Sequence, residues 1–503
     1  MPKIVINEYD KTKAIANEYA NFAVVIPGPV GSSSKLTVFD DNGIYECASQ
    51  ADFIEKIGLQ SNVASTKEAK EAKAADPTPV TTEAVGNYFK ITVPVNTEIV
   101  VYEKTSKKKN PGYLVDEDGY VYEYAFKTEG EGLFTEEEVA KYFIFEKGKE
   151  GSDAVAAPMF MGNQIAYELL GLGYTVFYKK CNSDLSDLAN ATFWEALKDK
   201  TNYDFRYIMT GYLSGGEAAE NIINVAKERG DCIALLDIDS SVYKGEVARD
   251  TKINNIISEA NGYTADKNCA IFLPTVVYDL NRSENYDTVF NSNRRFPASF
   301  HYLTCVANAS ERYAEWYAAS GFTRGISTFG IKTTDFTVGE AIIDKLQPRN
   351  QASQDSSLEK PLKHAVNVIA KFRNQYLLWG NRTANTLRAG DDDDLIASDF
   401  LNIRQLCCTL KKQIYVACRQ LTFDPNSEML WINFKNKIRP ILEKMKADQG
   451  IQDYEFVKIT NAPKATLKAQ IRIVPIEAVE DFEIDVTLED SLDGVVIGET
   501  DAK

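Results

Sequence analysis

Few residues in this chain have the types and spacing that catalysis requires. The stretch Leu213-Ser-Gly-Gly-Glu217 follows a predicted strand and precedes a predicted helix, so its backbone N–H groups could hold an anion. It has neither the GxGxxG pattern of dinucleotide-binding proteins nor the lysine of a phosphate-binding P-loop. A turn that leads into a helix is the simpler interpretation, and phosphate binding there stays open as the alternative.

The acidic and histidine residues also have structural interpretations. Asp237 and Asp239 end a predicted central strand, where α/β sheets often carry functional residues, although an Asp in that position more often stabilises a turn. The four aspartates at 391–394 lack the spaced Gly and terminal Glu of a calcium loop, which favours a solvated acidic loop. His301 and His364, the only two histidines, are interpreted as packing or surface residues. We therefore expect no enzyme, no catalytic residue, no cofactor and no metal.

The cysteines and the apolar runs indicate the compartment. The eight cysteines are scattered without a CxxC pair, which favours buried free thiols over a zinc site. The N-terminus becomes acidic within eight residues and has no apolar core of a secretory signal. The longest apolar runs are strand-sized and far shorter than the roughly 20 residues of a membrane helix. We expect assembly in a cytoplasm without membrane insertion.

The middle of the chain alternates helix with strand. A helix over 163–170 precedes a strand over 174–178. A strand at 205–210, a helix at 217–229 and a strand at 232–237 then form a βαβ unit, with Gly230 placed to end the helix. Parallel strands joined by a covering helix predict an α/β domain with a parallel sheet.

The N-terminal part is predicted to be mostly strand. An apolar run at 22–26 ends at the turn sequence Pro27-Gly28-Pro29. Residues 61–84 are poor in large apolar side chains and predict a linker or an exposed helix and loop. Alternating or β-prone runs predict a small β-rich domain between Tyr88 and Phe145, with strands over 89–93, 99–102 and 119–124.

The C-terminal part begins with three predicted helices. Apolar spacing predicts them over 362–376, with His364 one turn inside, over 403–421, and from Ser427 onward with Pro440 interrupting or kinking the third. Strands follow at 470–474 and 481–488, and the chain also begins with a short strand at 3–7. The last residues predict a loose acidic tail.

Charge is unevenly distributed along the chain. The net charge is −17, yet residues 360–450 carry fifteen Lys and Arg against nine Asp and Glu, a balance of +6, so the rest carries −23. An acidic body argues against nucleic-acid binding as the main role, and a basic segment fits an acidic partner. Five basic residues crowd the third helix and could form the face that contacts this acidic partner, with a solvated face as the alternative: Lys435, Lys437, Arg439, Lys444 and Lys446.

A series of short motifs appears in order in the C-terminal third. It contains Trp379-Gly380-Asn381-Arg382-Thr383, then Asn402-Ile403-Arg404-Gln405, then Pro425-Asn426 before Trp431, then Gly450 to Tyr454, and finally Ile473-Val474-Pro475 through Glu480. This order and spacing resembles the core domain of contractile phage tail sheath proteins. Gln405 departs from the family, where a second Arg is usual, which weakens any inference of a salt bridge from that position. The βαβ unit, Phe296 to Ser299 and Trp316 to Gly325 resemble the middle α/β domain of the same family.

The resemblance implies a multidomain fold of α/β and α+β type, with a β-rich peripheral domain, a central α/β domain and a C-terminal α+β core domain with extended terminal arms. The domains are placed at 1–21 for the N-terminal arm, 22–150 for the peripheral domain, 151–345 for the central domain, 346–480 for the sheath core domain, and 481–503 for the C-terminal arm and acidic tail. The family core motif comprises Trp379, Gly380, Arg382, Thr383, Asn402, Arg404, Pro425, Asn426 and Trp431.

The resemblance also implies the function. Sheath subunits stack as hexameric rings around a tail tube and contract without nucleotide to drive the tube through the host cell envelope. The implied partners are other copies of the chain, the tail tube protein, the baseplate, and terminator or neck proteins, in a virion assembled in a bacterial host. In the family, terminal arms add strands to neighbouring subunits, and the matching residues here are Ile4, Val5, Ile6, Phe482, Ile484, Val486 and Leu488. Pairing of both strands within their own subunit is the alternative. A bacteriocin or injection-system sheath, and more distantly an α/β nucleotide-binding enzyme, remain competing functions.

Overall fold

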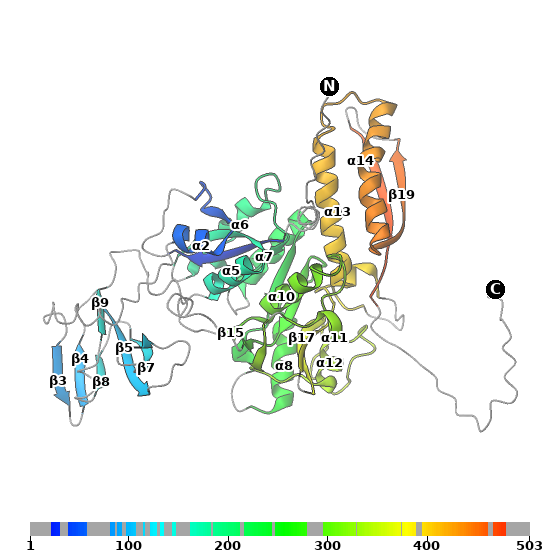
Figure 1. Cartoon of the computed structure of the whole chain (residues 1–503). Coiled ribbons are helices and arrows are strands. Elements are labelled where there is room, and N and C mark those ends of the chain that lie inside the picture. The colour runs from blue at the N-terminus through cyan, green and yellow to red at the C-terminus, as the bar shows by residue number, and fades with distance from the viewer. Residues whose placement is uncertain are drawn as a thin grey trace, which may run out of the picture.

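The computed structural model describes residues 22–30, 39–57, 161–182, 185–211, 216–243, 247–278, 295–327, 329–373, 375–388, 395–460 and 466–478, together with the backbone of the strands between 81 and 146. Their arrangement is a mixed α/β fold with several separate sheets, so the predicted multidomain α/β class is confirmed (Figure 1).

An eight-stranded sheet forms the centre of the described chain, in the order β18-β17-β13-β12-β11-β1-β10-β2. Its strands are β1 (Ala23–Pro29), β2 (Ile44–Cys47), β10 (Thr175–Cys181), β11 (Tyr207–Ile208), β12 (Ile233–Asp237), β13 (Cys269–Leu273), β17 (Val366–Phe372) and β18 (Gln375–Trp379). The six inner strands are parallel, and β2 and β18 pair antiparallel at the two edges. The short apolar runs of the inner strands suit a sheet that is buried on both faces.

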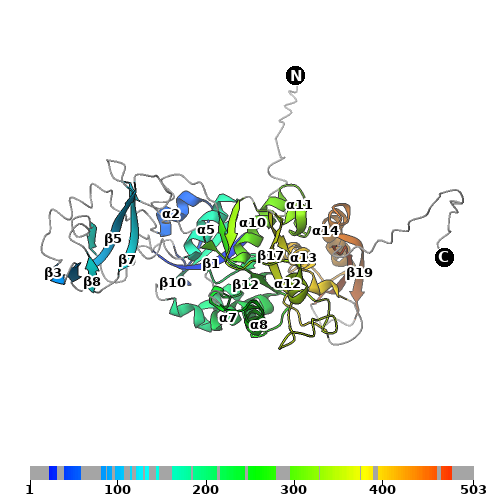
Figure 2. The same ribbon diagram turned by 90° about the horizontal axis from the view of Figure 1, so that it is seen from below.

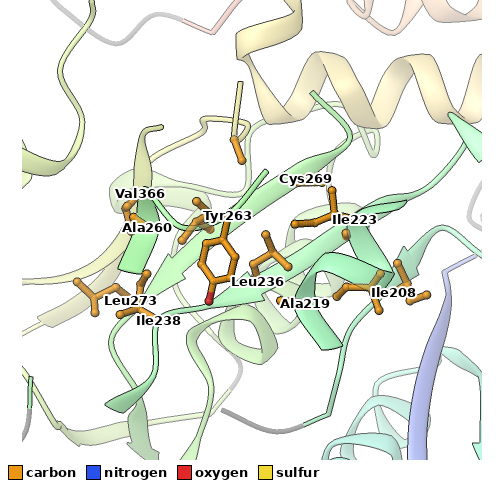
Figure 3. Packing of buried hydrophobic residues seen from close by; sticks show 14 of the residues in the cluster. Ile208, Ala219, Ile223, Leu236, Ile238, Ala260, Tyr263, Cys269, Leu273 and Val366 are labelled. Carbon is orange, nitrogen blue, oxygen red and sulfur yellow. The ribbon is translucent and has the colours of Figure 1, made fainter. Parts of the chain in front are cut away.

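Helices cover both faces of this sheet (Figure 2). One face packs against α2 (Gln50–Ile57), α5 (Met161–Gly171) and α10 (Ala298–Ser310), and the other against α6 (Ala191–Glu195), α7 (Glu217–Arg229), α8 (Arg249–Ala260) and α12 (Glu340–Leu346). Figure 3 shows the second layer, where Ala219 and Ile223 of α7 meet Leu236 of β12. Each large aliphatic side chain buried in this way contributes about 1.5–3 kcal/mol.

The predicted βαβ unit is confirmed. Helix α7 spans Glu217–Arg229 between β11 and β12, and these strands pair in parallel. Gly230 ends the helix with φ of +64°, a left-handed conformation that glycine adopts without steric penalty.

Three sequence-based expectations for the sheet need correction. The run at 22–26 belongs to β1, an inner strand of the central sheet, and β1 continues through Pro27-Gly28-Pro29, where a turn was expected. The helix expected over 362–376 is instead the strand pair β17–β18, and His364 lies in an isolated β-bridge with Thr386. All five residues from Val366 to Ala370 are buried, polar Asn367 among them. The apolar residues therefore do not alternate strictly with polar ones, and they fit helical spacing as well as strand spacing.

The remaining small sheets lie outside the central one. One contains β14 (Val276–Tyr278), β15 (Arg295–Phe296) and β16 (Ile331–Thr334). Two further sheets confirm the β-rich region: β3 (Thr81–Val85), β4 (Tyr88–Thr92) and β8 (Glu131–Phe134) form one, and β5 (Thr97–Ser106), β6 (Leu114–Val115), β7 (Val121–Lys127) and β9 (Phe143–Glu146) form the other. The end of the linker expected at 61–84 therefore belongs to β3. Short helical turns complete the fold: α11 (Gly321–Arg324), Ser186–Ala189, Ala196–Lys198, Ser240–Val242 and Ala397–Asp399.

Two helices and a hairpin extend away from the central sheet (Figure 1). They are α13 (Leu401–Arg419), α14 (Glu428–Ala447), β19 (Ile451–Ile459) and β20 (Lys468–Pro475), which we call the projecting unit. Both helices confirm the sequence prediction, and α14 continues through Pro440. A separate apolar cluster built around Trp431, Phe434, Ile438 and Leu442 holds the unit together.

Candidate functional site

The first family motif lies where β18 ends. Gly380 has φ of +131°, and a Cβ added there would lie 2.6 Å from Gln347 Nε2 and 2.7 Å from Asn367 Oδ1. Gln347 Nε2 donates to the carbonyl of Trp379 at 2.7 Å. The chain can therefore turn out of the sheet at this point only because residue 380 has no side chain.

Asn381 and Asn402 fix the start of α13. Asn381 Nδ2 donates to Asn402 Oδ1 at 2.7 Å, and the backbone N–H of Asn402 donates to Asn381 Oδ1 at 3.1 Å. Asn402 Nδ2 also donates to the carbonyl of Trp316 at 3.2 Å. Both asparagines are buried, so this exchange satisfies polar groups that would otherwise lose water without compensation.

Arg382 and Thr383 tie the same turn to the residues before α13. The backbone N–H of Arg382 donates to Asn367 Oδ1 at 2.8 Å, and its guanidinium lies 5.3 Å from the ring centre of Phe400. Thr383 Oγ1 donates to the carbonyl of Ser398 at 2.8 Å. The motif residues therefore position α13.

Arg404 contacts the C-terminal end of α7. Arg404 Nη2 and Lys411 Nζ both donate to the carbonyl of Gly230 at 2.7 Å. Two cations at the C-terminus of a helix satisfy its last carbonyl and interact favourably with the helix dipole. This contact joins Arg404 of α13 to Gly230 of the central domain, which lies 174 residues earlier in the sequence.

Gln405 has a role that the family pattern did not suggest. It is buried, and its Nε2 donates to the hydroxyls of Tyr207 and Tyr302 at 2.7 Å each. The two tyrosine rings pack edge to face with centres 6.2 Å apart. A neutral amide therefore links β11, α10 and α13 where a salt bridge would be the family expectation.

A buried ion pair lies beneath α13, and no local sequence pattern indicated it. Arg206 pairs with Glu315, and the two side chains are 1% and 4% exposed. Arg206 Nη2 also donates to Thr409 Oγ1 of α13 at 2.6 Å. Burial opposes the charge of Arg206, but the carboxylate of Glu315 raises its pKa above the usual value. The partners are 109 and 203 residues apart, so no local pattern could reveal them.

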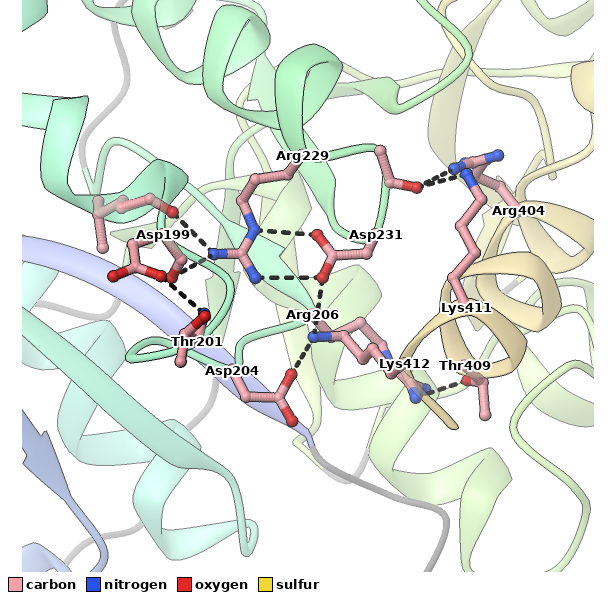
Figure 4. Close-up of polar contacts among 12 residues, drawn as sticks. Asp199, Thr201, Asp204, Arg206, Arg229, Asp231, Arg404, Thr409, Lys411 and Lys412 are labelled. Carbon is pink, nitrogen blue, oxygen red and sulfur yellow. Dashed lines mark hydrogen bonds and ion pairs between the residues drawn. The ribbon is translucent and has the colours of Figure 1, made fainter. Parts of the chain in front are cut away.

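A second charged cluster lies where α13 meets the central domain, a contact region that we call the joint (Figure 4). Arg229 binds Asp231 through two hydrogen bonds, Nε to Oδ1 at 2.9 Å and Nη2 to Oδ2 at 3.2 Å. Lys412 of α13 pairs with Asp204 and lies 3.7 Å from Asp231 Oδ2. Tyr415 further along α13 shares a 3.1 Å hydrogen bond with Thr201. These contacts brace α13 against the central domain.

The last family residues lie at the opposite end of the projecting unit. Trp431 is 7% exposed and stacks on Phe434 with ring centres 5.6 Å apart. Pro425 and Asn426 are exposed in the turn before α14, and the backbone N–H of Ser427 donates to the carbonyl of Pro425 at 2.8 Å. The motif therefore marks two places: the joint, and the core of the projecting unit.

The five basic residues of α14 do not share one face. At 100° per residue, Lys435, Arg439 and Lys446 lie on one flank of the buried side, and Lys437 and Lys444 lie on the other. On the first flank, Lys435 Nζ lies 5.3 Å from the ring centre of Trp431, and Lys446 pairs with Asp453 of β19 at 3.0 Å. On the second, exposed Lys437 donates to the neutral amide of Gln420 at 2.6 Å. The single basic face assumed from sequence is thus two separate rows.

Strands β19 and β20 form a two-stranded antiparallel sheet over the helices. Their inward residues, such as Tyr454, Phe456 and Ile471, are half-buried against the apolar cluster of the projecting unit. Within the described residues each strand has a partner on one side only, so each presents an open edge. Open edges are templates for strands of another chain.

The terminal strand residues Ile4, Val5, Ile6, Phe482, Ile484, Val486 and Leu488 lie outside the described residues, as do the aspartates at 391–394 and most of the turn at 213–217. Asp237 accepts hydrogen bonds from the backbone N–H and Oγ of Ser299 at the start of α10, and Asp239 accepts from the N–H of Ser241. Both therefore serve as caps. Among the described residues no cluster of His, Cys, Asp or Glu could hold a metal ion, and no described helix has the length and apolarity to cross a bilayer.

Both histidines and most of the cysteines that the structure describes are buried. His301 is fully buried in α10, where its Nδ1 lies 2.8 Å from the hydroxyl of Tyr278, and burial lowers its pKa to about 3. All eight cysteines are free, and six are buried, as expected.

Comparisons with known proteins found similarity to a phage tail sheath protein. No protein-family model matches the chain. The tail sheath protein of Vibrio phage KVP40 is 25% identical over 254 residues, which are 49% of this chain and 34% of that protein. The chain thus spans about a third of the length of this relative.

Three solved structures have folds similar to that of this chain. A sheath complex of the PVC extracellular contractile injection system in its contracted state has 15% identity and a TM-score of 0.47, over 65% of this chain and 80% of that chain. An anti-feeding prophage baseplate in the contracted state has 15% identity and a TM-score of 0.45, over 66% and 83%. A sheath tail protein from Desulfitobacterium hafniense has 10% identity and a TM-score of 0.36, over 95% and 100%. Through its curated relative, this chain is similar to a phage tail sheath protein, which confirms the resemblance carried by its C-terminal motifs.

Proposed function

We propose that this chain is a structural subunit of a contractile tail sheath, which polymerises as stacked hexameric rings around a tail tube. Contraction of the stack drives the tube through the host cell envelope for genome delivery. The sheath belongs to a virion that is assembled in the bacterial host cytoplasm, and the baseplate and the terminator or neck proteins bound its two ends. The similarity to a phage tail sheath protein supports a phage tail over a bacteriocin or injection system.

The observation that carries the proposal is the firm attachment of the projecting unit to the central domain. Its open-edged hairpin offers backbone groups to other subunits, and its base is held by the buried Arg206–Glu315 pair and by the contacts of Arg404 and Gln405. A firmly mounted unit transmits movement between subunits without deforming. Contraction then needs no nucleotide, because two packings of the same rigid subunits can differ in free energy.

We propose that the N- and C-terminal arms link the subunits by adding strands to the β19–β20 hairpin of neighbours. Such strands form main-chain hydrogen bonds that survive rigid-body movement of the domains between them. Deleting residues 1–10 should leave a folded monomer that cannot polymerise, as measured by sedimentation velocity. A truncated chain that assembles normally would show that this arm pairs within its own subunit.

We propose that the tube contact involves the row of α14 that contains Lys437. Lys437 is exposed and hydrogen-bonds a neutral group, whereas Lys446 already pairs with an acidic residue of its own chain. Lys437→Glu should therefore weaken assembly on the tube, with Lys446→Glu as the matched control. Equal effects of the two changes in low salt, where screening is weakest, would argue against this row.

The chain is proposed to be no enzyme and to need no cofactor. Asp237 and Asp239, the strand-end candidates for a nucleotide or metal site, both act as caps of helical turns. A panel of nucleotides should therefore leave the thermal midpoint unchanged, whereas a ligand that binds only the folded chain would raise it.

A further inference from the structure

A pocket lies beside the segment that leads from β18 into α13. Its walls come from Arg349 and Asn350 after α12, from residues between 382 and 388 after β18, and from Leu395 and Asp399 before α13. The pocket holds about 360 Å³ of empty space, part of which is open solvent. Because drug-sized ligands need about 300–1,000 Å³ of enclosed space, this pocket suits a ligand smaller than a nucleotide.

The lining of this pocket is positively charged. Among the described residues it contains three guanidinium groups, those of Arg349, Arg382 and Arg388, and the carboxylate of Asp399, a balance of +2. A cleft lined by charges of one sign concentrates ions of the opposite sign. Guanidinium groups also present their N–H donors in a planar fork that matches the oxygens of phosphate and carboxylate. The charge of the pocket therefore favours an anion.

The carboxylate of Asp399 is already bound by groups of its own chain. Its Oδ1 accepts from Asn385 Nδ2 at 2.7 Å, and its Oδ2 accepts from Arg388 Nη2 at 2.7 Å and from the backbone N–H of Ile396 at 2.9 Å. These three donors fix the carboxylate beside Arg388, on the wall formed by the segment before α13. The overall charge of the pocket remains positive with this pair in place.

Arg382 contributes a buried charge to the lining. It is 4% exposed, and its guanidinium lies 5.3 Å from the ring centre of Phe400. A charge taken out of water is stabilised by an opposite charge nearby, so an anion in the pocket would stabilise Arg382. Asn350 is equally buried and lines the same space, where its amide adds polar groups to the wall.

We propose that this pocket binds a small inorganic oxyanion of the phosphate class, which Arg349, Arg382 and Arg388 hold. Charge-assisted hydrogen bonds from guanidinium groups to phosphate oxygens are among the strong hydrogen bonds of proteins, and they are often bidentate. The bound ion joins the loop after α12 to the segment that positions α13, so it strengthens the joint. This site does not depend on the proposed function, and the experiments below use the full chain before it assembles.

Calorimetric titration with inorganic phosphate, at an ionic strength held constant with sodium chloride, measures binding. Arg349→Gln and Arg388→Gln each remove one guanidinium group from the pocket. Arg312→Gln is the matched control, because Arg312 is exposed and lies outside the pocket. We expect a single phosphate site with an affinity about tenfold lower in either pocket variant, which corresponds to about 1.4 kcal/mol, and unchanged in the control. No binding, or equal affinity in all four chains, would mean an adventitious ion only and would overturn the proposal.

Hydrogen exchange locates the bound ion. The backbone N–H of Gln351 donates to the carbonyl of Arg388 at 2.9 Å, and the N–H of Leu387 donates to the carbonyl of Lys363 at 2.8 Å, so both bonds fix parts of the pocket wall. Phosphate should slow the exchange of these two N–H groups more than that of the N–H groups in β19, which lies outside the pocket. Equal slowing in both places would be the general stabilisation that excluded salts give, and it would contradict a specific site.

The acidic run at 391–394 follows Arg388 in sequence, outside the described residues, and allows a second test. The fourfold change Asp391→Asn, Asp392→Asn, Asp393→Asn and Asp394→Asn removes its charge. Phosphate binding that is unchanged or tighter in this variant would support a free ion as the ligand. Binding that appears only in this variant would show that carboxylates of the chain itself neutralise the pocket, which would overturn the proposal. Circular dichroism checks the folding of each chain, and Arg349→Gln, at an exposed residue, carries the test if Arg388→Gln does not fold.

Discussion

Removal of the Glu315 carboxylate should weaken the attachment of the projecting unit to the central domain. Its carboxylate pairs with Arg206, and the exposed fractions of the two side chains are 4% and 1%. Breaking a buried pair by removing one partner leaves an uncompensated buried charge and costs about 3–5 kcal/mol. Glu315→Met should therefore lower the free energy of unfolding by that amount. The double change Arg206→Met and Glu315→Met should cost less than the single one, because both charges are then gone.

Urea titration measures the free energy of unfolding. Hydrogen exchange is measured separately along α13, because Arg206 also donates to Thr409 of that helix. We expect faster exchange along α13 in the single variant and partial recovery in the double variant. The exposed pair Lys446–Asp453 provides the control, because the side chains are 45% and 73% exposed and such pairs contribute about 0–1 kcal/mol. If Glu315→Met cost no more than Lys446→Met, the ion pair would not hold the joint.

Three further changes test other parts of the structure. Gly380→Ala should destabilise the chain by more than about 1 kcal/mol, because the new Cβ meets Gln347 and Asn367 at φ of +131°; an unchanged thermal midpoint would contradict this. Burial raises the pKa of Asp237 to about 7, so the folded state binds the extra proton and stability should fall as pH rises from about 4 to 7. Asp237→Asn should remove that slope, at most about 1.4 kcal/mol per pH unit, and an identical pH profile would refute the assignment. Trp431→Ala should cost about 3–5 kcal/mol, measured as loss of protection in α14, and full protection would show that its packing is dispensable.

The sequence predicted elements well where local patterns act alone. The helix over 217–229 and its end at Gly230 agree with the structure because apolar spacing and a glycine cap are local signals. The strand β17 was mistaken for a helix because it is buried on both faces and lacks alternation. Membership of β1 in the central sheet depends on pairing with β10, about 150 residues later, which no local pattern encodes.

The candidate site was only partly visible in the sequence. The motif residues Gly380, Asn402 and Arg404 do converge at the joint, but the motif gave no reason for their presence. Their partners, such as Trp316 and Gly230, come from distant segments. The basic residues of α14 were recognised as a group, yet their division into two rows needs the helix phase and the position of β19.

Negative-stain electron microscopy of the purified chain, with and without its tail tube, tests the central claim most directly. The sheath assignment predicts wide, hollow, ring-striated cylinders, which form on the tube and are lost when residues 1–10 are deleted. A discrete monomer or dimer that persists with and without the tube would contradict the assignment.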